Sequence, residues 1–346
     1  MNNQKPKSPR RGEPRRSANK AHSAESPSSA TASAVPCPEE NVPDITPRMR
    51  AIAAQDGPIL ITGETGTGKS VLARHLRSLS KRKDKPLIVR GCGEFDVGTV
   101  EAQLFGHSRD AYTGASTEQD GVFQQANGGT LVLDDVDYLP KPMQTRLLRF
   151  LDDGTFHRLG ESDRPRRANV RLIVTSNKDL QALSATGQFL PDLFFRLSHW
   201  RIMLSPLRSQ PEAVRTLANR LLARFDQANG EPPRTFSQDA LDLLACMAWP
   251  GNVRELKATV ENIALEVMGT RRTVIGLDGA AAILLDPHSG RQIGGLPLLP
   301  DLSEDERMFR LLVVTGWNIS LSASLLGVSR NTIYDRVRTR GWRRPA

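Results

Sequence analysis

Residues 58–70 read PILITGETGTGKS, and this stretch decides the fold class. An apolar run typical of a buried strand leads into GETGTGKS, which matches the phosphate-binding pattern GxxxxGK[ST]. The glycines let backbone N–H groups approach phosphates, and the helix that follows adds the positive end of its dipole. We expect the whole motif to bind ATP; its residues are Gly63, Glu64, Thr65, Gly66, Thr67, Gly68, Lys69 and Ser70.

A second motif, GGTLVLDD at 128–135, is an apolar run that ends in two carboxylates. The carboxyl ends of parallel strands meet at one edge of a sheet, so this motif is expected beside the glycine loop. Ser70 and Asp134 are then predicted to hold Mg²⁺, while Lys69 reaches the β- and γ-phosphates. Asp135 is predicted to be the general base that polarises the attacking water. A glycine turn without a ligand and a surface acidic turn are the alternatives.

Apolar runs at 86–89 and 170–176 continue the strand pattern, and helical patterns alternate with them. Such alternation indicates βαβ units and a parallel sheet. After Pro211 the pattern is wholly helical, with segments near 211–227, 237–247 and 252–268. We therefore predict an α/β fold that is followed by helical units.

The net charge of +9 is concentrated at the two ends of the chain. Residues 1–24 carry seven Lys or Arg against one Glu, and residues 329–346 carry six Arg against one Asp. This distribution indicates a polyanion partner. The first 43 residues are rich in Ser, Pro and basic residues, and we expect a disordered arm that either contacts DNA or solubilises the protein.

Composition argues against secretion, membrane insertion and zinc binding. No apolar run approaches the roughly 18 residues that span a bilayer, and the amino terminus has no apolar signal core. The three cysteines (Cys37, Cys92 and Cys246) are far apart and have no metal-binding spacing. We expect a cytoplasmic protein with free thiols and no membrane contact.

Residues 317–341, WNISLSASLLGVSRNTIYDRVRTRG, are predicted to form a helix-turn-helix. Gly327 permits the turn and Ser329 caps the second helix, whose N-terminal end would meet base edges and whose later turns would meet phosphates. The residues assigned to DNA binding are Arg330, Asn331, Thr332, Tyr334, Arg336 and Arg338. A helix at 303–316 is expected to pack against this unit or its twin. A helical hairpin used only for dimer packing is the alternative.

These motifs together resemble the AAA+ domain of sigma-54-dependent transcription activators, over residues 46–341. QLFGHSRDAYTGA (103–115) is similar to the family's ELFGHxxGAFTGA loop. VRLIVTSNKDL (170–180) is similar to its sensor I strand, and WPGNVREL (249–256) to its sensor II helix. The segment 317–341 is similar to the Fis-like C-terminal domain of the same family.

The resemblance implies an AAA+ P-loop sheet with a helical lid and a C-terminal all-α DNA-binding domain. It also implies a homo-oligomer, commonly a hexameric ring assembled from dimers, with ATP at the subunit interfaces. The expected segments are a basic arm at 1–43, an α/β ATPase subdomain at 44–210, a helical lid at 211–285, a linker at 286–300 and a helix-turn-helix domain at 301–346.

The resemblance assigns roles to three more residues. Asn177 would monitor the γ-phosphate at the end of the sensor I strand. Arg254 would contact the phosphates of its own subunit, at the start of a helix that Asn252 and Glu255 are expected to cap as a box. Arg196, in DLFFRL, aligns with an arginine finger that reaches into the neighbour's site and stabilises the transition state. A plain helix-surface arginine is the alternative for Arg254, and an ordinary salt-bridging arginine is the alternative for Arg196.

The loop that contains Tyr112, Thr113 and Gly114 is implied to contact sigma-54. Tyr112 and Thr113 would lie at the tip of a hairpin that faces the axis of the ring. A conformational change coupled to the γ-phosphate would raise or withdraw this tip. A structural turn with a buried tyrosine is the alternative.

The chain departs from the family pattern at four positions. Asp110 replaces the first glycine of GAFTGA, and Asp135 replaces the usual glutamate, so its carboxylate is one methylene further from the water. Gly91 stands where an asparagine usually gates that glutamate, and Leu190 stands where a second trans-acting arginine is usual. These changes weaken hydrolysis more than nucleotide binding.

The leading hypothesis is an ATP-dependent transcription regulator that binds DNA upstream of a promoter and remodels RNA polymerase holoenzyme containing sigma-54. The alternative is an ATPase-impaired nucleotide-binding DNA regulator or scaffold that acts with a competent paralogue. A helicase loader or replication initiator is disfavoured by the TGA-type loop. Since only the basic arm precedes the ATPase region in this sequence, we expect control by expression level, by a partner protein or by the ATPase itself.

Overall fold

The structure is a computed structural model, and it describes most of the chain from Thr46 onward. The described residues are 46–96, 98–112, 115–161, 163–270, 272–277, 279–280, 303–315 and 317–343, with only the backbone described at Arg310 and Val314. The predicted arm at 1–43, the predicted linker at 286–300 and the loop residues Thr113 and Gly114 lie outside the described residues.

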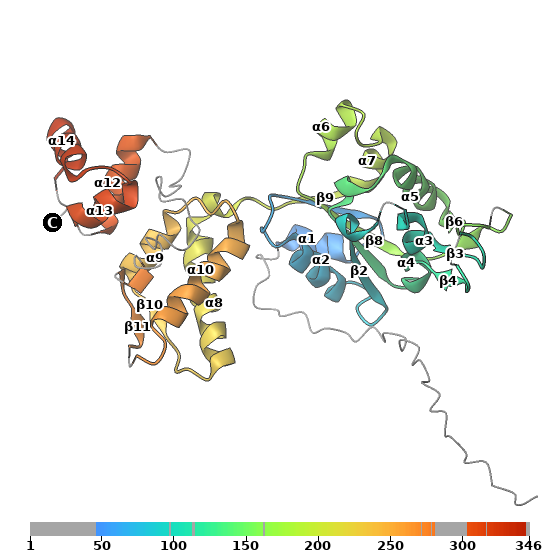
Figure 1. The fold of residues 1–346 in the computed structure, drawn as a ribbon, viewed down its shortest axis with the longest axis horizontal. Coiled ribbons are helices and arrows are strands. Elements are labelled where there is room, and N and C mark those ends of the chain that lie inside the picture. Colours follow the sequence, from blue (N-terminus) through green and yellow to red (C-terminus); the bar gives the residue numbers. More distant parts are fainter. Residues whose placement is uncertain are drawn as a thin grey trace, which may run out of the picture. The chain divides into compact units, whose positions relative to one another are not determined.

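A five-stranded sheet with the order β2-β5-β8-β1-β9 forms the centre of the α/β part (Figure 1). All neighbouring strands are parallel. The strands are β1 (Ile59–Thr62), β2 (Leu87–Gly91), β5 (Thr130–Asp134), β8 (Arg171–Ser176) and β9 (Trp200–Met203). The predicted parallel α/β sheet is therefore confirmed.

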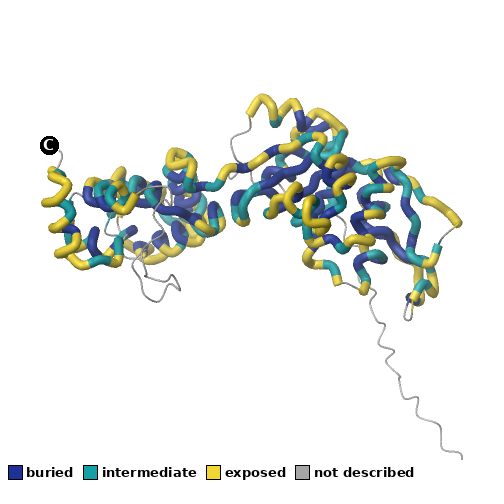
Figure 2. Tube along the Cα trace, turned by 90° about the horizontal axis from the view of Figure 1, so that it is seen from above, coloured by how far each residue is buried: buried dark blue, intermediate teal, exposed yellow. Residues whose placement is uncertain are grey.

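Alternate side chains of the central strands enter two separate cores on opposite faces of the sheet. Ile59 and Ile61 pack into one core, whereas Leu60 between them packs into the other. The same alternation in β5 sends Val132 to the first core and Leu131 to the second. Because both faces are buried, the central strands are continuous apolar runs in the sequence rather than alternating ones (Figure 2).

Strand β9 was not among the predicted strands, and its burial explains why. It pairs with β1 at the edge of the sheet, and only Ile202 of its four residues is buried. Met203 is 69% exposed. An edge strand of this kind lacks the continuous apolar run that marks the central strands.

The described residues of the α/β part form seven α-helices. They are α1 (Pro47–Ala53), α2 (Lys69–Ser78), α3 (Val100–Phe105), α4 (Val122–Gln125), α5 (Lys141–Asp153), α6 (Leu180–Ala185) and α7 (Pro191–Leu197). Thr46 and Asp179 cap α1 and α6 by accepting from backbone N–H groups of the first turn. Within the part of the chain that the structure describes, no helix combines the length and apolar character needed to cross a bilayer.

Two short antiparallel hairpins leave the α/β part between its main elements. One joins β3 (Gly106–His107) to β4 (Gln119–Asp120), and the other joins β6 (Thr155–Phe156) to β7 (Arg166–Arg167). Each pairs only two residues per strand, which is too short to be stable alone. Both hairpins therefore depend on packing against the helices beneath them.

The helical unit that follows has an apolar core that is separate from the two cores of the sheet. Its elements are α8 (Pro211–Asn229), β10 (Thr235–Phe236), α9 (Gln238–Ala245), α10 (Asn252–Glu266) and β11 (Val274–Ile275). The core includes Leu222, Leu244 and Ile263, each fully buried. Inside it, Arg234 is paired with the equally buried Asp226.

The C-terminal unit consists of α12 (Glu304–Val314), α13 (Ile319–Leu326) and α14 (Arg330–Arg340). Gly327 ends α13 with φ 66°, a left-handed conformation that glycine adopts without a Cβ penalty. The Ser329 hydroxyl accepts from the N–H of Thr332 at 3.1 Å and so caps α14. The turn and the cap predicted from the sequence are both present.

A cluster of four phenylalanines supports the two hairpins. Phe105 ends α3 just before β3, and Phe156 belongs to β6. The Phe123 ring lies 5.1 Å from that of Phe105 and 4.4 Å from that of Phe150, centroid to centroid. Phe123 is fully buried, so it is the centre of this cluster.

Replacing Phe123 by alanine should lower the free energy of unfolding by about 3–5 kcal/mol, because it leaves a cavity in a packed aromatic cluster. Denaturant unfolding followed by circular dichroism measures this loss. Phe195→Ala is the matched control, since Phe195 is 71% exposed; its effect should stay within about 0.5 kcal/mol. Equal losses in the two variants would contradict the packing described for Phe123.

Candidate functional site

The glycine-rich loop after β1 folds into a phosphate-binding geometry. Gly66 and Gly68 have φ values of 81° and 95°, which L-residues with a side chain rarely adopt. Gly68 directly precedes the first residue of α2. Backbone N–H groups of the loop and of the first turn of α2 are thereby available for an anion.

The side chains of Lys69 and Ser70, the first residues of α2, contact two different parts of the site. The Lys69 Nζ donates to the carbonyl oxygens of Gly63 at 2.9 Å and Glu64 at 3.1 Å, across the loop. Burial lowers the pKa of the Lys69 ammonium, while the Asp135 and other nearby carboxylates oppose this shift. The Ser70 hydroxyl donates to Oδ2 of Asp134 at 2.5 Å, so the two predicted Mg²⁺ ligands are in contact.

Asp134 and Asp135 end β5 beside this loop. Asp134 also accepts from the hydroxyl of Thr175 on β8. A hydroxyl and a carboxylate fit Mg²⁺, which takes oxygen ligands and commonly uses only one or two protein carboxylates together with phosphates. No cluster of three or more His, Cys, Asp or Glu side chains suited to a metal occurs among the described residues.

The Asp135 side chain is oriented by an unusual backbone. Its φ of 52° is left-handed, and its N–H donates to the Thr175 hydroxyl at 3.0 Å. Burial raises the pKa of the Asp135 carboxyl, and the neighbouring carboxylate of Asp134 raises it further. A carboxylate whose proton affinity is raised in this way is better suited to accept a proton.

The predicted nucleotide-binding residues largely meet at one cavity of about 1140 Å³. Those that line it are Thr65, Gly66, Thr67, Gly68, Lys69, Ser70, Asp134, Asp135, Asn177 and Arg254. The Asn177 amide donates to the Thr65 hydroxyl at 3.4 Å. The sequence did not indicate several apolar lining residues, among them Met49, Leu204 and Leu217, because they carry no motif.

Arg196 lies elsewhere. Its side chain is 54% exposed on α7 and forms an ion pair with Asp152 at 2.7 Å. It does not line the cavity of its own chain. Its neighbour Phe195 is exposed as well. Within this chain Arg196 is therefore a salt-bridged surface arginine, as the alternative expects, and its role as an arginine finger stays a prediction.

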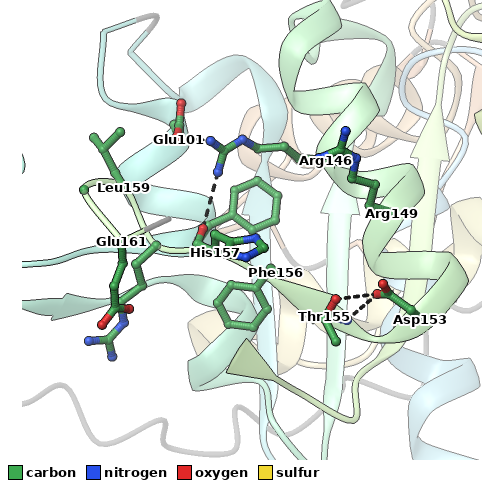
Figure 3. Close-up of a pocket in the computed structure, with 12 residues that line it drawn as sticks. Glu101, Arg146, Arg149, Asp153, Thr155, Phe156, His157, Leu159 and Glu161 are labelled. Carbon is green, nitrogen blue, oxygen red and sulfur yellow. Dashed lines mark hydrogen bonds and ion pairs between the residues drawn. The ribbon is translucent and has the colours of Figure 1, made fainter. Parts of the chain in front are cut away.

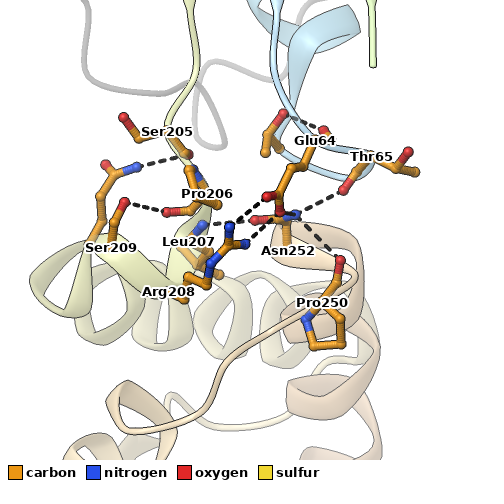
Figure 4. Close-up of polar contacts among 11 residues, drawn as sticks. Glu64, Thr65, Ser205, Pro206, Leu207, Arg208, Ser209, Pro250 and Asn252 are labelled. Carbon is orange, nitrogen blue, oxygen red and sulfur yellow. Dashed lines mark hydrogen bonds and ion pairs between the residues drawn. The ribbon is translucent and has the colours of Figure 1, made fainter. Parts of the chain in front are cut away.

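The predicted capping box of Asn252 and Glu255 does not form at the start of α10. Such a box needs the Glu255 carboxylate to accept from the N–H of Asn252, but it accepts from the N–H of Gly251, four residues earlier, at 2.8 Å. The Asn252 side chain does not cap the helix; its amide donates to the carbonyl of Thr65 at 3.0 Å and to Oε2 of Glu64 at 3.2 Å (Figure 4). The prediction for Asn252 was wrong because its left-handed backbone, with φ 50°, turns the side chain toward the P-loop.

The segment between β3 and β4 carries the predicted partner loop. Tyr112 is 43% exposed, so the alternative of a buried tyrosine does not hold, and its ring lies edge-on to that of His107 at 5.2 Å. Asp110 has φ 61° and donates its N–H to the carbonyl of Ala115 at 2.8 Å. A glycine would adopt this conformation at least cost, and aspartate is among the residues that tolerate it.

The second hairpin is bonded directly to this loop. The Leu159 N–H donates to the carbonyl of Gly106 at 2.9 Å, and the Ser108 N–H donates to that of Leu159 at 3.0 Å. Arg158, which is 5% exposed, pairs with Glu118 at 3.2 Å and with Asp120. The sequence did not single out Arg158, since its partners are some forty residues away.

Beneath the second hairpin lies a cavity of about 720 Å³ (Figure 3). Arg146 on α5 pairs there with Glu101 at 2.5 Å and donates to the carbonyl of His157 at 3.3 Å. Its guanidinium also lies 5.7 Å from the centre of the Phe105 ring. One arginine therefore ties α3, α5 and the hairpin together.

Two further departures from the family pattern have clear structural settings. Gly91 pairs with Asp134 in the sheet, and a Cβ at this position would lie 2.9 Å from the flexible Glu94 carboxyl group. Leu190 precedes α7, donates its N–H to the Gln144 side chain at 2.9 Å and packs against the core. Neither position offers the polar side chain that the resemblance led us to expect.

The surface of α14 is mostly available to a partner. The exposed residues among those assigned to DNA binding are Arg330, Asn331, Thr332, Tyr334 and Arg338. Arg336 is half-buried and pairs with Asp305 on α12 at 2.7 Å. Arg340 pairs with the same aspartate. Arg336 is thus the one assigned residue that is held within the domain.

Comparison with known families and proteins places the chain in one lineage. The sigma-54 interaction domain matches residues 37–203, and the AAA+ ATPase lid domain matches residues 208–278. The alginate biosynthesis transcriptional regulatory protein AlgB of Pseudomonas aeruginosa is 38% identical over 292 residues, covering 84% of this chain and 64% of AlgB. The transcriptional regulatory protein ZraR of Klebsiella oxytoca is 34% identical over 303 residues, covering 84% of this chain and 67% of ZraR. This chain thus spans about two thirds of the length of both relatives.

Solved structures agree with this placement. NtrX from Brucella abortus in complex with ATP is similar with a TM-score of 0.64 and 26% identity, covering 85% of this chain and 66% of NtrX. Its complex with ADP gives the same TM-score of 0.64. The parallel sheet, the helical lid and the matches in sequence all point the same way. The chain belongs to the family of sigma-54-dependent transcriptional regulators, whose sigma-54 interaction domain is an AAA+ ATPase.

Proposed function

We propose that this protein is an ATP-dependent transcription regulator that hydrolyses ATP to remodel RNA polymerase holoenzyme containing sigma-54. The observation that carries the proposal is the meeting of Lys69, Ser70 and Asp134 with the predicted base and sensors at one cavity. The matches to the sigma-54 interaction domain and the AAA+ lid support it. The ATP complex of NtrX supports ATP as the nucleotide.

The chemistry follows from the charges around the cavity. Ser70 and Asp134 would hold Mg²⁺, which neutralises phosphate charge when it is bound. Lys69 and Arg254, which both line the cavity, would bring positive charge to the phosphates. Asp135 accepts a proton from the water that attacks the γ-phosphorus, the bond to the ADP oxygen breaks, and the products are ADP and phosphate.

Completion of the site requires a second subunit in this proposal. Arg196 is exposed and remote from the cavity of its own chain. A ring, commonly hexameric in this family, would bring it to the nucleotide of a neighbour, where a finger of this kind stabilises the transition state. The interface therefore controls turnover, and turnover should rise with protein concentration.

The loop of Tyr112 is the proposed contact with sigma-54. Tyr112 is exposed, and the loop is bonded to the second hairpin, which in turn is tied to α5 through Arg146. α5 follows β5, the strand that ends in Asp134 directly before Asp135. A change at the γ-phosphate can therefore reach the loop through packed elements. On the same proposal, α14 anchors the protein to DNA upstream of the promoter.

A second candidate is an ATPase-impaired DNA regulator or scaffold that acts with a competent paralogue. Three observations favour it: the short carboxylate of Asp135, the missing side chain at Gly91 and the aliphatic Leu190 at the base of α7. Each change affects hydrolysis while the P-loop geometry stays intact.

Turnover separates the two candidates. ATP hydrolysis by the purified protein should rise cooperatively with concentration, and Asp135→Asn should lower it by about 10²-fold or more through loss of the base. Asp135→Glu should raise it, because the longer side chain approaches the water more closely. Asp239→Asn, an exposed change on α9, is the matched control. A wild-type rate equal to that of Asp135→Asn at every concentration would leave only the scaffold.

Tyr112→Ala should abolish capture of sigma-54 in the presence of a transition-state phosphate mimic, because the exposed ring is the proposed contact. Co-sedimentation or gel-shift of the trapped complex measures it. Tyr334→Ala is the matched control, since Tyr334 is 57% exposed in a different domain. Unchanged capture by Tyr112→Ala would refute the proposed role of the loop.

In DNA binding, changes on α14 should matter and the change at Tyr112 should not. Arg330→Gln and Tyr334→Ala on α14 should each weaken binding to the promoter-upstream region by about 10-fold or more, through lost base or phosphate contacts. Tyr112→Ala should bind as tightly as the wild type in the same electrophoretic titration. Full binding by both α14 variants would exclude α14 as the DNA contact.

A further inference from the structure

Asn252 combines three properties that are rarely found together. It is fully buried, it has the left-handed φ of 50°, and it begins α10 two residues before Arg254. Buried polar side chains normally have hydrogen-bond partners, and strained backbones persist where the surroundings demand them. The hydrogen-bond partners of Asn252 therefore indicate which contacts keep its backbone in the left-handed conformation.

The Asn252 side chain joins three segments that are distant in the sequence (Figure 4). Its Nδ2 donates to the carbonyl of Thr65 at 3.0 Å and to Oε2 of Glu64 at 3.2 Å, both in the P-loop. Its Oδ1 accepts from the N–H of Leu207 at 2.8 Å, in the segment that leads into α8. A single amide thus connects the P-loop, this segment and the start of α10.

Glu64 is held in place from its other side. The Arg208 guanidinium donates to both of its carboxylate oxygens, each at 2.7 Å, a bidentate geometry that is among the stronger side-chain pairings. These hydrogen bonds from Arg208 lower the pKa of the Glu64 carboxyl below its usual range. Glu64 therefore remains an anion that can accept from Asn252 as well.

The two backbones are also in close contact here. A Cβ on Gly66 would lie 2.2 Å from the carbonyl oxygen of Gly251, the residue before Asn252. Any side chain at Gly66 would push the start of α10 away from the P-loop. The contact is thus built from complementary backbones and not only from side chains.

The geometry points to Asn252 as a positioning residue: it fixes the start of α10 on the P-loop, with Glu64 and Arg208 as its brace, and so places Arg254 on the phosphates. The nucleotide then meets an arginine that is already oriented. This inference rests on the proposed nucleotide site but does not require hydrolysis, because it concerns binding.

Equilibrium binding of a fluorescent ADP with Mg²⁺ to the full chain tests it. Asn252→Gly keeps the left-handed backbone and deletes the amide, and it should raise Kd by about tenfold. Arg254→Ala should weaken binding in the wild type but have little further effect beside Asn252→Gly, because the arginine is no longer placed. Multiplicative effects of the two changes, or unchanged binding by Asn252→Gly, would overturn the inference.

An exchange of donor and acceptor supplies a second readout. Asn252→Asp faces Glu64 with a like charge and should bind ADP more weakly than Asn252→Gly does. Adding Glu64→Gln to Asn252→Asp restores one donor–acceptor pair and should recover part of the affinity. Failure of this rescue in a protein with wild-type thermal stability would contradict direct contact between the two side chains.

Arg215→Gln is the matched control for Arg208→Gln, since Arg215 also pairs with carboxylates but only within the helical unit, with Glu212 and Asp242. Arg208→Gln should raise the Kd for ADP several-fold, and Arg215→Gln should leave it unchanged. Equal effects would overturn the role of the brace.

If the wild type binds ADP with these dependences and yet fails to hydrolyse ATP, the proposed function fails while the positioning role stands.

Discussion

The parallel register of three strands is the constraint on which the site depends. β1 and β8 end side by side, with Thr62 opposite Ser176, and Leu133 of β5 lies opposite Val174 of β8. The P-loop, the carboxylates of β5 and the end of β8 therefore emerge at one edge of the sheet. Because both faces of the sheet are buried, a shift of one residue in any strand would place apolar side chains in the wrong core. The chemistry of the edge is thus protected by the packing of the interior.

Polar contacts between residues that are distant in the sequence then join the elements around this edge. Arg158 pairs with Glu118 and Asp120 at the β4 end of the partner loop, and Arg146 holds the second hairpin on α5. On the other side, Asn252 and Arg208 hold the P-loop to the helical unit. The P-loop is therefore linked directly to the helical unit, whereas Arg146 and Arg158 connect the partner loop to α5 through the second hairpin. Both links are charged or amide-based, so their geometry is more directional than apolar packing alone would give.

Local sequence was sufficient for the fold class and for the motif residues that line the cavity, but not for the rest of its lining. A glycine loop with Lys69 and a strand that ends in Asp134 have few other structural uses, and a sheet edge brings them together. Contacts between segments that are distant in the sequence could not be predicted from local patterns. The box predicted for Asn252 followed from its spacing to Glu255, but the left-handed backbone directs the side chain to Thr65 instead. Strand β9 was missed for a related reason, since the apolar pattern fades at an edge. In both cases tertiary packing, and not local sequence preference, determines the observed structure.

The ion pairs of Asp305 have a consequence for the C-terminal unit. This aspartate pairs with both Arg336 and Arg340, which lie on the helix proposed to bind DNA, and so offsets part of their charge. A phosphate that binds either arginine competes with this carboxylate, so it gains less electrostatic free energy than it would from an unpaired arginine. Fewer cations would then be expelled from the DNA than the number of arginines suggests. On the proposal that α14 binds DNA, Asp305 lowers the electrostatic part of the binding free energy, so that binding would depend more on the fit to the groove.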